Sequence, residues 1–253
     1  MGGALLAGWQ EQGLSLAYVV DPSEGAKALA SDTVKVVSQP DDLPVDFLPK
    51  AVILAVKPQM ASAALPAYAR FAGNALFISI MAGKTVAGIS TLLGGAGAVV
   101  RAMPNTPASV REGITVAYAN NLSPAHKALA TTLLASVGKV AWVAEEAMLD
   151  PVTAISGGGP AYVFLLTELL EQAGLDQGLP ADLARLMARQ TVIGSALLLA
   201  MSAETPEALR TSVTSPGGTT AEALKLLRAD DALPKIFKAA IQAATERSRE
   251  LSN

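Results

Sequence analysis

The sequence predicts an α/β fold in which a doubly wound parallel sheet is followed by an all-α domain. Three observations lead to this prediction. Short apolar runs rich in β-branched residues alternate with helical patterns through residues 1–148. These runs are apolar throughout rather than alternating, as in strands that are buried on both faces. Beyond residue 148 the runs stop, and only helical patterns remain.

The first part of the chain alternates strand and helix signals. The predicted strands are Leu16–Val20, Ala51–Val56, Ala75–Ile80, Ala98–Ala102, Gly113–Ala119 and a weak one at Val140–Val143. The helical patterns between them are Ala4–Gln12, Ser23–Ala30, Ala61–Tyr68, Ala87–Leu93 and Pro124–Ser136. Strand and helix in alternation are typical of a parallel sheet covered by helices.

The second part contains helical patterns only, and several begin at a proline. They cover Pro160–Gln172, Pro180–Ala203, Pro206–Thr211, Thr219–Leu227 and Leu233–Leu251. The segment 180–203 carries no charge after Arg189, so we expect it to be buried against other helices or a second subunit. We place the boundary after an acidic stretch, which gives domains 1–148 and 149–253.

Composition excludes several classes of function. The chain has no Cys and one His, His126, so cysteine chemistry and a His-rich metal site are excluded, and no metal is expected. A net charge of −3 gives no field that attracts nucleic acid. Hydrophobic residues are 51% and charged residues 16% of the chain, which favours a buried subunit interface. We find no membrane-spanning run and no secretory signal, and so expect a cytoplasmic protein.

The N-terminus resembles the end of a dinucleotide-binding fingerprint. Gly2 and Gly3 open a helical pattern, and a strand follows that ends at Asp21. A complete fingerprint has a strand, G-x-G-x-x-G, a helix, a second strand and an acidic residue about 20 positions after the glycines. The chain therefore looks as if it starts at the last glycine, without the first strand. The alternative is an ordinary N-terminal helix with small residues.

A glycine turn, Ser215-Pro216-Gly217-Gly218, precedes Thr219 and Thr220, which open an amphipathic helix. Free N–H groups and the positive dipole end of a helix bind anions, and glycine lets the backbone approach a ligand closely. The turn could therefore hold a small carboxylate. The alternative is a helix cap of a common kind. A second turn, Ser156–Pro160, serves either as a hinge or as a ligand-facing loop.

Together these motifs resemble the pyrroline-5-carboxylate reductase family. The matching stretches are Met1-Gly2-Gly3, Ala55–Pro58, Ile78–Gly83, Arg101–Pro107, Ser156–Tyr162 and Val213–Thr220. The resemblance implies a Rossmann domain followed by a helical dimerisation domain. It also implies that the chain reduces 1-pyrroline-5-carboxylate to L-proline with NAD(P)H, the last step of proline biosynthesis.

The resemblance assigns roles to particular residues. The substrate carboxylate is expected at Ser215, Gly217, Gly218, Thr219 and Thr220, with the Thr220 hydroxyl beside the ring nitrogen as the catalytic group. The cofactor is expected at Gly2, Asp21, Ala55, Val56, Lys57, Pro58, Met81, Ala82, Gly83 and Asn105. Asp21 favours NADH, because an acidic residue there binds the ribose 2′-OH and repels a 2′-phosphate.

The family forms homodimers through its helical domain, and its dimers often stack into a decamer, so we expect a homo-oligomer. Three alternatives stay open. A β-hydroxyacid dehydrogenase shares this plan but uses a Lys on the helix after the interdomain glycines, and residues 160–171 contain none. A ketopantoate-type reductase is the second, and its pattern of lysine and acid is also missing here. A non-catalytic dinucleotide-binding protein is the third, because the fingerprint is incomplete.

Overall fold

The computed structural model describes residues 1–95 and 97–252, and its packing separates into two compact units. The first unit contains Met1–Gly157 together with the end of the chain from Ala244, and the second contains Gly158–Ala243. The last helix therefore begins in the second unit and ends in the first. The boundary we predicted at 148/149 stays a prediction, and the two units divide a little later, after Gly157.

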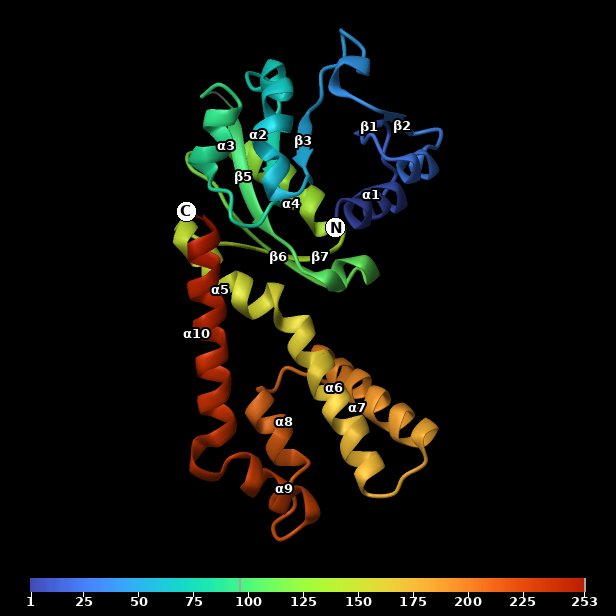
Figure 1. Cartoon of the computed structure of the whole chain (residues 1–253), viewed down its shortest axis with the longest axis vertical. Helices are drawn as coiled ribbons and strands as arrows, with labels where there is room; N and C mark the ends of the chain where they lie inside the picture. Colours follow the sequence, from blue (N-terminus) through green and yellow to red (C-terminus); the bar gives the residue numbers. More distant parts are fainter. Residues whose placement is uncertain (96, 253) are drawn as a thin grey trace. The chain divides into compact units, whose positions relative to one another are not determined.

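The first unit contains two separate sheets (Figure 1). A two-stranded parallel sheet pairs β1 (Ala17–Val20) with β2 (Val34–Val37). The second sheet has the order β3-β4-β5-β6-β7, with strands Ala51–Leu54, Leu76–Ser79, Ala98–Met103, Gly113–Tyr118 and Gly138–Trp142. Among the described residues, β1 pairs only with β2, and β3 pairs only with β4. The side of β3 that faces away from β4 and β5 therefore has no paired strand among them. The sheet is thus interrupted between β1 and β3, where a dinucleotide-binding fold places its first strand.

One strand pair runs opposite to the others. β3, β4 and β5 are parallel, as are β6 and β7, but β5 and β6 are antiparallel. The connection between β5 and β6 holds only a 3-10 turn, Thr106–Val110, and a parallel crossover needs a dozen or more residues. The short connection therefore forces the change of direction.

Helices cover the sheet on both faces, and each face has its own apolar cluster. The helices are α1 (Gly2–Glu11), α2 (Ala61–Ala64), α3 (Val86–Leu92) and α4 (Pro124–Ala135). One cluster contains Leu54, Phe77 and Ile89, and the other contains Leu5, Ile78 and Leu134. Alternate residues of β4 contribute to opposite clusters, and all four of its residues are buried.

The second unit consists of helices. A short helix, α5 (Leu149–Val152), and a π-helical turn, Thr153–Gly157, end the first unit. There follow α6 (Gly159–Asp176), α7 (Ala181–Met201), α8 (Pro206–Ser212), α9 (Thr219–Leu227) and α10 (Ala232–Ser252). A glycine lets α6 and α7 pack closely, since a methyl group at Gly174 of α6 would lie 3.1 Å from the Cβ of Ala184 of α7. Figure 1 shows α6 and α7 side by side.

The predicted fold class, a Rossmann-like sheet followed by a helical domain, is confirmed. The sequence analysis missed β2, which is short and contains a lysine. It also predicted regular helices at 23–30 and 61–68. The first is a 3-10 helix, Glu24–Leu29, and the second is one α-helical turn continued by the 3-10 segment Leu65–Phe71. Pro66 accounts for the second difference, because it lacks the N–H that an α-helix requires.

Candidate functional site

Three of the predicted cofactor segments follow neighbouring parallel strands. Ala55–Pro58 follows β3, Met81–Gly83 follows β4, and Asn105 follows β5. Because β3, β4 and β5 are parallel, these segments lie at the same, carboxyl edge of the five-stranded sheet. Open α/β sheets bind their ligands at this edge.

Gly2 lies close to the first of these segments. A methyl group at Gly2 would lie 3.0 Å from Ala55 Cβ, so the first turn of α1 packs against the residue that follows β3. No side chain caps this helix. The first N–H groups of an α-helix have no intrahelical partner, so α1 presents open donors to an anion at the carboxyl edge.

Asp21 directly follows β1, and its carboxylate is held in place. Its Oδ1 accepts the N–H of Ser23 at 2.9 Å, which fixes the carboxylate at the strand end. The nearest basic side chain in sequence, Lys27, is paired with Glu24 at 2.9 Å. The turn after β1 therefore offers a carboxylate and no unpaired lysine of its own, which is an environment suited to a ribose diol.

The other two segments are held by internal contacts. Asn105 Oδ1 accepts the N–H of Ile114 at 2.9 Å, which fixes the start of the 3-10 turn against β6. Gly83 has φ +69°, and a methyl there would lie 2.6 Å from the carbonyl oxygen of Leu251. The end of α10 thus packs on the loop after β4, and only glycine fits that contact.

The turn Ser215–Gly218 forms a tight loop in front of α9. Gly217 has φ +69°, and the N–H of Gly218 donates to the carbonyl of Ser215 at 3.0 Å. Gly218 is the N-cap of α9, and no side chain caps the helix. The N–H groups of Thr219 and Thr220 are therefore open, and both side chains are exposed. This geometry can hold a carboxylate through backbone donors.

Sequence reasoning missed two polar contacts that support the carboxyl edge. Glu146 Oε1 accepts the N–H of Val86 at 2.8 Å and Arg101 Nη1 at 3.2 Å, so one carboxylate caps α3 and pairs with a buried arginine of β5. Ser248 Oγ donates to Asp150 Oδ1 at 2.7 Å, which attaches the end of α10 to α5. The acidic stretch before residue 151 was the available signal, and the sequence analysis used it only as a domain boundary.

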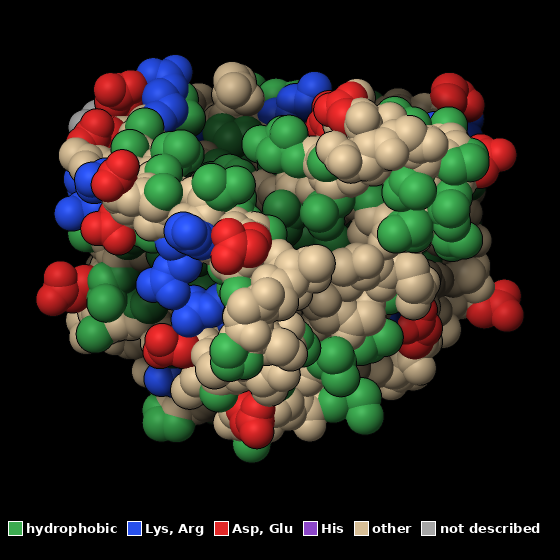
Figure 2. Space-filling view, turned by 90° about the horizontal axis from the view of Figure 1, so that it is seen from below, with side chains coloured by type: hydrophobic (Ala, Val, Ile, Leu, Met, Phe, Trp, Pro, Cys, Tyr) green, Lys and Arg blue, Asp and Glu red, His purple; other side chains and the backbone are tan. Residues whose placement is uncertain are grey.

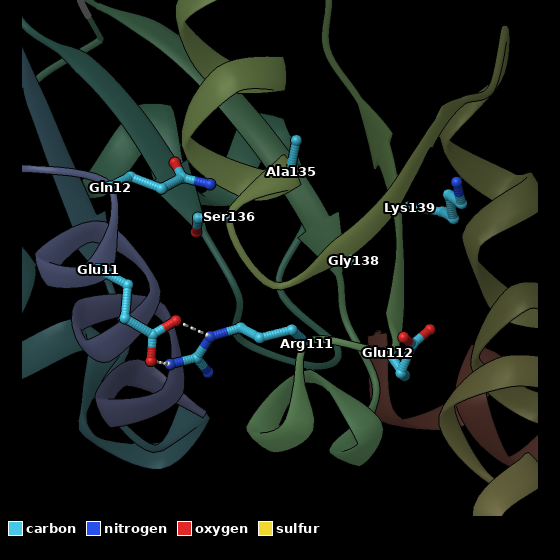
Figure 3. A pocket seen from close by; sticks show the side chains of 8 residues that line it. All are labelled: Glu11, Gln12, Arg111, Glu112, Ala135, Ser136, Gly138 and Lys139. Carbon is cyan, nitrogen blue, oxygen red and sulfur yellow. Dashed lines mark hydrogen bonds and ion pairs between the residues drawn. The ribbon is translucent and has the colours of Figure 1, made fainter.

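A separate pocket lies at the other end of α1 (Figure 3). Arg111 adopts φ 65° and donates two hydrogen bonds to Glu11, at 2.6 and 2.8 Å. This bidentate pairing lowers the pKa of Glu11 through the side-chain hydrogen bond and raises that of Arg111. None of the predicted site residues lines this pocket. Because its arginine is already paired, the pocket is part of the anchoring of α1.

Comparison with known proteins identifies the family. The sequence pattern described as "Pyrroline-5-carboxylate reductase dimerisation" matches residues 146–251. The pyrroline-5-carboxylate reductase of Pseudomonas aeruginosa is 38% identical over 258 residues, which cover 100% of this chain and 93% of that protein. The chain belongs to the pyrroline-5-carboxylate reductase family.

Solved structures of the family superimpose on the chain along its length. The Coxiella burnetii pyrroline-5-carboxylate reductase has a TM-score of 0.92 at 34% identity and covers 100% of this chain and 95% of its own. The Plasmodium falciparum pyrroline carboxylate reductase, solved with NADP bound, has a TM-score of 0.84 at 29% identity, with the same coverage. The suspected relationship to this family is thus confirmed, and the roles of individual site residues stay predictions.

Proposed function

We propose that the chain reduces 1-pyrroline-5-carboxylate to L-proline with NAD(P)H as the last step of proline biosynthesis. The observation that carries the proposal is full-length membership of the family, with the Ser215–Thr220 turn intact at the open N-terminus of α9. A β-hydroxyacid dehydrogenase is not favoured, because α6 contains no lysine. The strand ends suit a dinucleotide, since α1 presents open donors beside the end of β3 and Asp21 offers a fixed carboxylate at the end of β1.

The reaction needs no strong general acid or base from the protein. The substrate is a cyclic imine that bears a carboxylate, and its nitrogen is basic enough to take a proton from water. A bound nicotinamide dinucleotide supplies the hydride that reduces the imine carbon. The N–H groups of Gly218, Thr219 and Thr220 are the candidates for the carboxylate, and the Thr220 hydroxyl orients the ring nitrogen. Catalysis is then mainly positioning, which suits a chain with a single His and no Cys.

The activity is tested with the purified chain, by following NADH oxidation on addition of pyrroline-5-carboxylate and NAD⁺ reduction by proline at high pH.

We expect Thr220→Ala to lower kcat about tenfold to a hundredfold, because it removes a hydrogen bond to a charged group. Thr205→Ala is the control, since Thr205 caps α8 at 3.2 Å and its loss costs stability of about 1 kcal/mol without changing kcat. Dinucleotide binding without turnover would instead indicate a non-catalytic binding protein, and unchanged kcat in Thr220→Ala would contradict the role of its hydroxyl.

Asp21 makes NADH the expected cofactor of choice. We expect Asp21→Ser to raise the KM for NADH about tenfold, the effect of one hydrogen bond to a charged group, and to improve the use of NADPH. Asp32→Asn, in the exposed loop before β2, is the matched control for a lost surface charge. Steady-state kinetics of the unaltered chain that show a large advantage for NADPH would contradict this assignment.

We further infer that the chain forms a homodimer through its helical unit, that dimers stack into a decamer, and that the protein is cytoplasmic. Within the described chain one helix, α7, is long and apolar enough to cross a membrane by length and composition. This differs from the expectation that no segment would qualify. Because α7 lies inside the match to the dimerisation pattern, we assign its apolar surface to a second copy of the chain. Light scattering at micromolar concentration tests the assembly, and a monomer would contradict it.

A further inference from the structure

The loop after β4 is fixed at its start by its own strand and at its end by a residue from far along the chain. It runs from Met81 to Thr85, between β4 and α3, at the carboxyl edge of the sheet. At its start, the N–H of Met81 donates to the hydroxyl of Ser79 at 3.3 Å, and the Met81 side chain is buried. At its end, Val86 begins α3.

The distant residue is Glu146, and it caps α3 together with a local side chain. Glu146 Oε1 accepts the N–H of Val86 at 2.8 Å, while the Thr85 hydroxyl accepts the N–H of Gly88 at 3.1 Å. The first N–H groups of a helix have no intrahelical partner, so both contacts satisfy open donors. The Thr85 cap shapes only the first turn of α3. The Glu146 cap also determines where this turn, and the loop before it, lie on the sheet.

Glu146 is itself attached to the sheet. Arg101 of β5 donates to the same Oε1 atom at 3.2 Å, and the Arg101 side chain is buried, as is most of the Glu146 side chain. A hydrogen bond between two charged groups is stronger than one between neutral groups. The carboxylate therefore ties the end of the loop to the strand next to β4.

The loop also contacts the end of α10, which the same segment of the chain holds in place. A methyl group at Gly83 would lie 2.6 Å from the carbonyl oxygen of Leu251, so α10 packs directly on the loop. Asp150 Oδ1 accepts the hydroxyl of Ser248 at 2.7 Å, and both residues are buried. Glu146 and Asp150 both lie in the short segment after β7. This segment supports the loop through α3 and through α10.

We propose that Glu146 is a positioning residue for the dinucleotide, because through the N–H of Val86 it holds the loop after β4 in the shape that receives the cofactor. This inference rests on the proposed use of NAD(P)H. Open α/β sheets bind their ligands at the carboxyl ends of the strands, where this loop lies. A loop that is already ordered costs less free energy to bind than a mobile one. The residue that fixes the loop therefore raises the affinity for the dinucleotide by acting through another residue.

The experiment separates the cap from the ion pair with two double variants of the full chain. In both, Arg101→Met removes the charge that pairs with Glu146. Together with Glu146→Gln, it keeps a side-chain oxygen that accepts the N–H of Val86. Together with Glu146→Leu, it removes that oxygen. Both variants replace a buried ion pair by uncharged side chains, a change that folded proteins often tolerate.

Two measurements compare the variants. Calorimetric titration with NADH, and in parallel with NADPH, is done without substrate, and we expect the Kd to be at least about tenfold higher for the Glu146→Leu variant than for the Glu146→Gln variant. Amide exchange in the free chain, followed by NMR, should be at least about tenfold faster at Val86 in the Glu146→Leu variant. Ile80 is the internal reference, because its N–H donates to the carbonyl of Leu54 within the sheet at 3.1 Å.

The outcomes distinguish a positioning role from a structural one. An equal Kd for the two variants would overturn the proposal, and so would a lower Tm or faster exchange at Val86 without a change in Kd, because the contact would then only stabilise the fold. If the unaltered chain bound neither NADH nor NADPH, the proposed function would fail together with this inference. If the unaltered chain binds a dinucleotide and the two variants bind it equally, only this inference fails.

Discussion

The two units of the chain bury their apolar side chains to very different degrees. In the first unit, Phe77, Leu76 and Ile78 of β4 are fully buried, and two clusters fill the two faces of the sheet. In the second unit, α6 has no buried residue, and the only buried residues of α7 are Ala184 and Ala188. Large apolar side chains of both helices are instead exposed: Phe164, Leu165, Leu166, Leu169, Leu186, Leu197, Leu198 and Met201. Figure 2 shows hydrophobic side chains interspersed among polar ones over the face seen from below.

This difference indicates that the units are stabilised in different ways. The first unit gains its stability from its own core. A monomer rarely exposes so many large apolar side chains on two adjacent helices, and such surfaces mark interfaces. The helical unit is therefore completed by association, so its stability should depend on protein concentration. The predictions below test this contrast.

Phe77→Ala should produce the largest effect, and it should be independent of concentration. Removing a fully buried aromatic side chain from β4 is expected to lower the free energy of unfolding by about 3–5 kcal/mol. Urea unfolding at two protein concentrations measures both properties. Phe164→Ala is the comparison, because Phe164 is 67% exposed and its loss should matter only through the dimer. A cost below about 1 kcal/mol for Phe77→Ala would contradict the assignment of the core.

Leu198→Glu should weaken the dimer at least about a hundredfold, because a charge would be buried in an apolar interface without a partner. Leu198 is 64% exposed in the single chain, so the substitution should not disturb the fold of the monomer. Light scattering over a dilution series measures the dissociation constant. Val45→Glu is the control, because Val45 is 97% exposed but lies in the first unit. An unchanged dimer in Leu198→Glu would place the interface elsewhere.

Much of the fold could be predicted from the sequence because its signals are local. Apolar runs such as Ala75–Ile80 and proline-initiated helices such as Pro124–Ser136 correspond to elements in the structure. The sequence analysis predicted a parallel sheet and so missed the direction of β6, although the short connection from β5 to β6 was a signal for it. The incomplete fingerprint was visible in the sequence, but the division of the strands into two separate sheets shows only in their pairing.

Some parts of the candidate site could be predicted from the sequence, and others could not. The Ser215–Thr220 turn and the loops after β3 and β4 carry glycine and proline signals, so their positions at element ends could be predicted. The supporting contacts could not, because they join residues far apart in sequence: Arg101 with Glu146, and Asp150 with Ser248. No periodicity or spacing relates such partners, and only the packing of α3 on β5 and of the end of α10 on α5 brings them together.

The smallest expected effect is the pH dependence that comes from the anchor of α1. The hydrogen bond from Arg111 lowers the pKa of Glu11 in the folded chain, while in the unfolded chain the group titrates near its ordinary value of about 4.3. The stabilisation is therefore fully present above about pH 4.3 and is lost as the pH falls through the lowered pKa of the folded state. Glu11→Gln should lower the urea midpoint slightly at neutral pH and leave it unchanged in acid, where both chains carry a neutral side chain.

Glu112→Gln is the control, because Glu112 lines the same pocket without an ion pair within the described residues. A difference between Glu11→Gln and the unaltered chain that persists in acid would mean that packing, rather than the charge, anchors the helix.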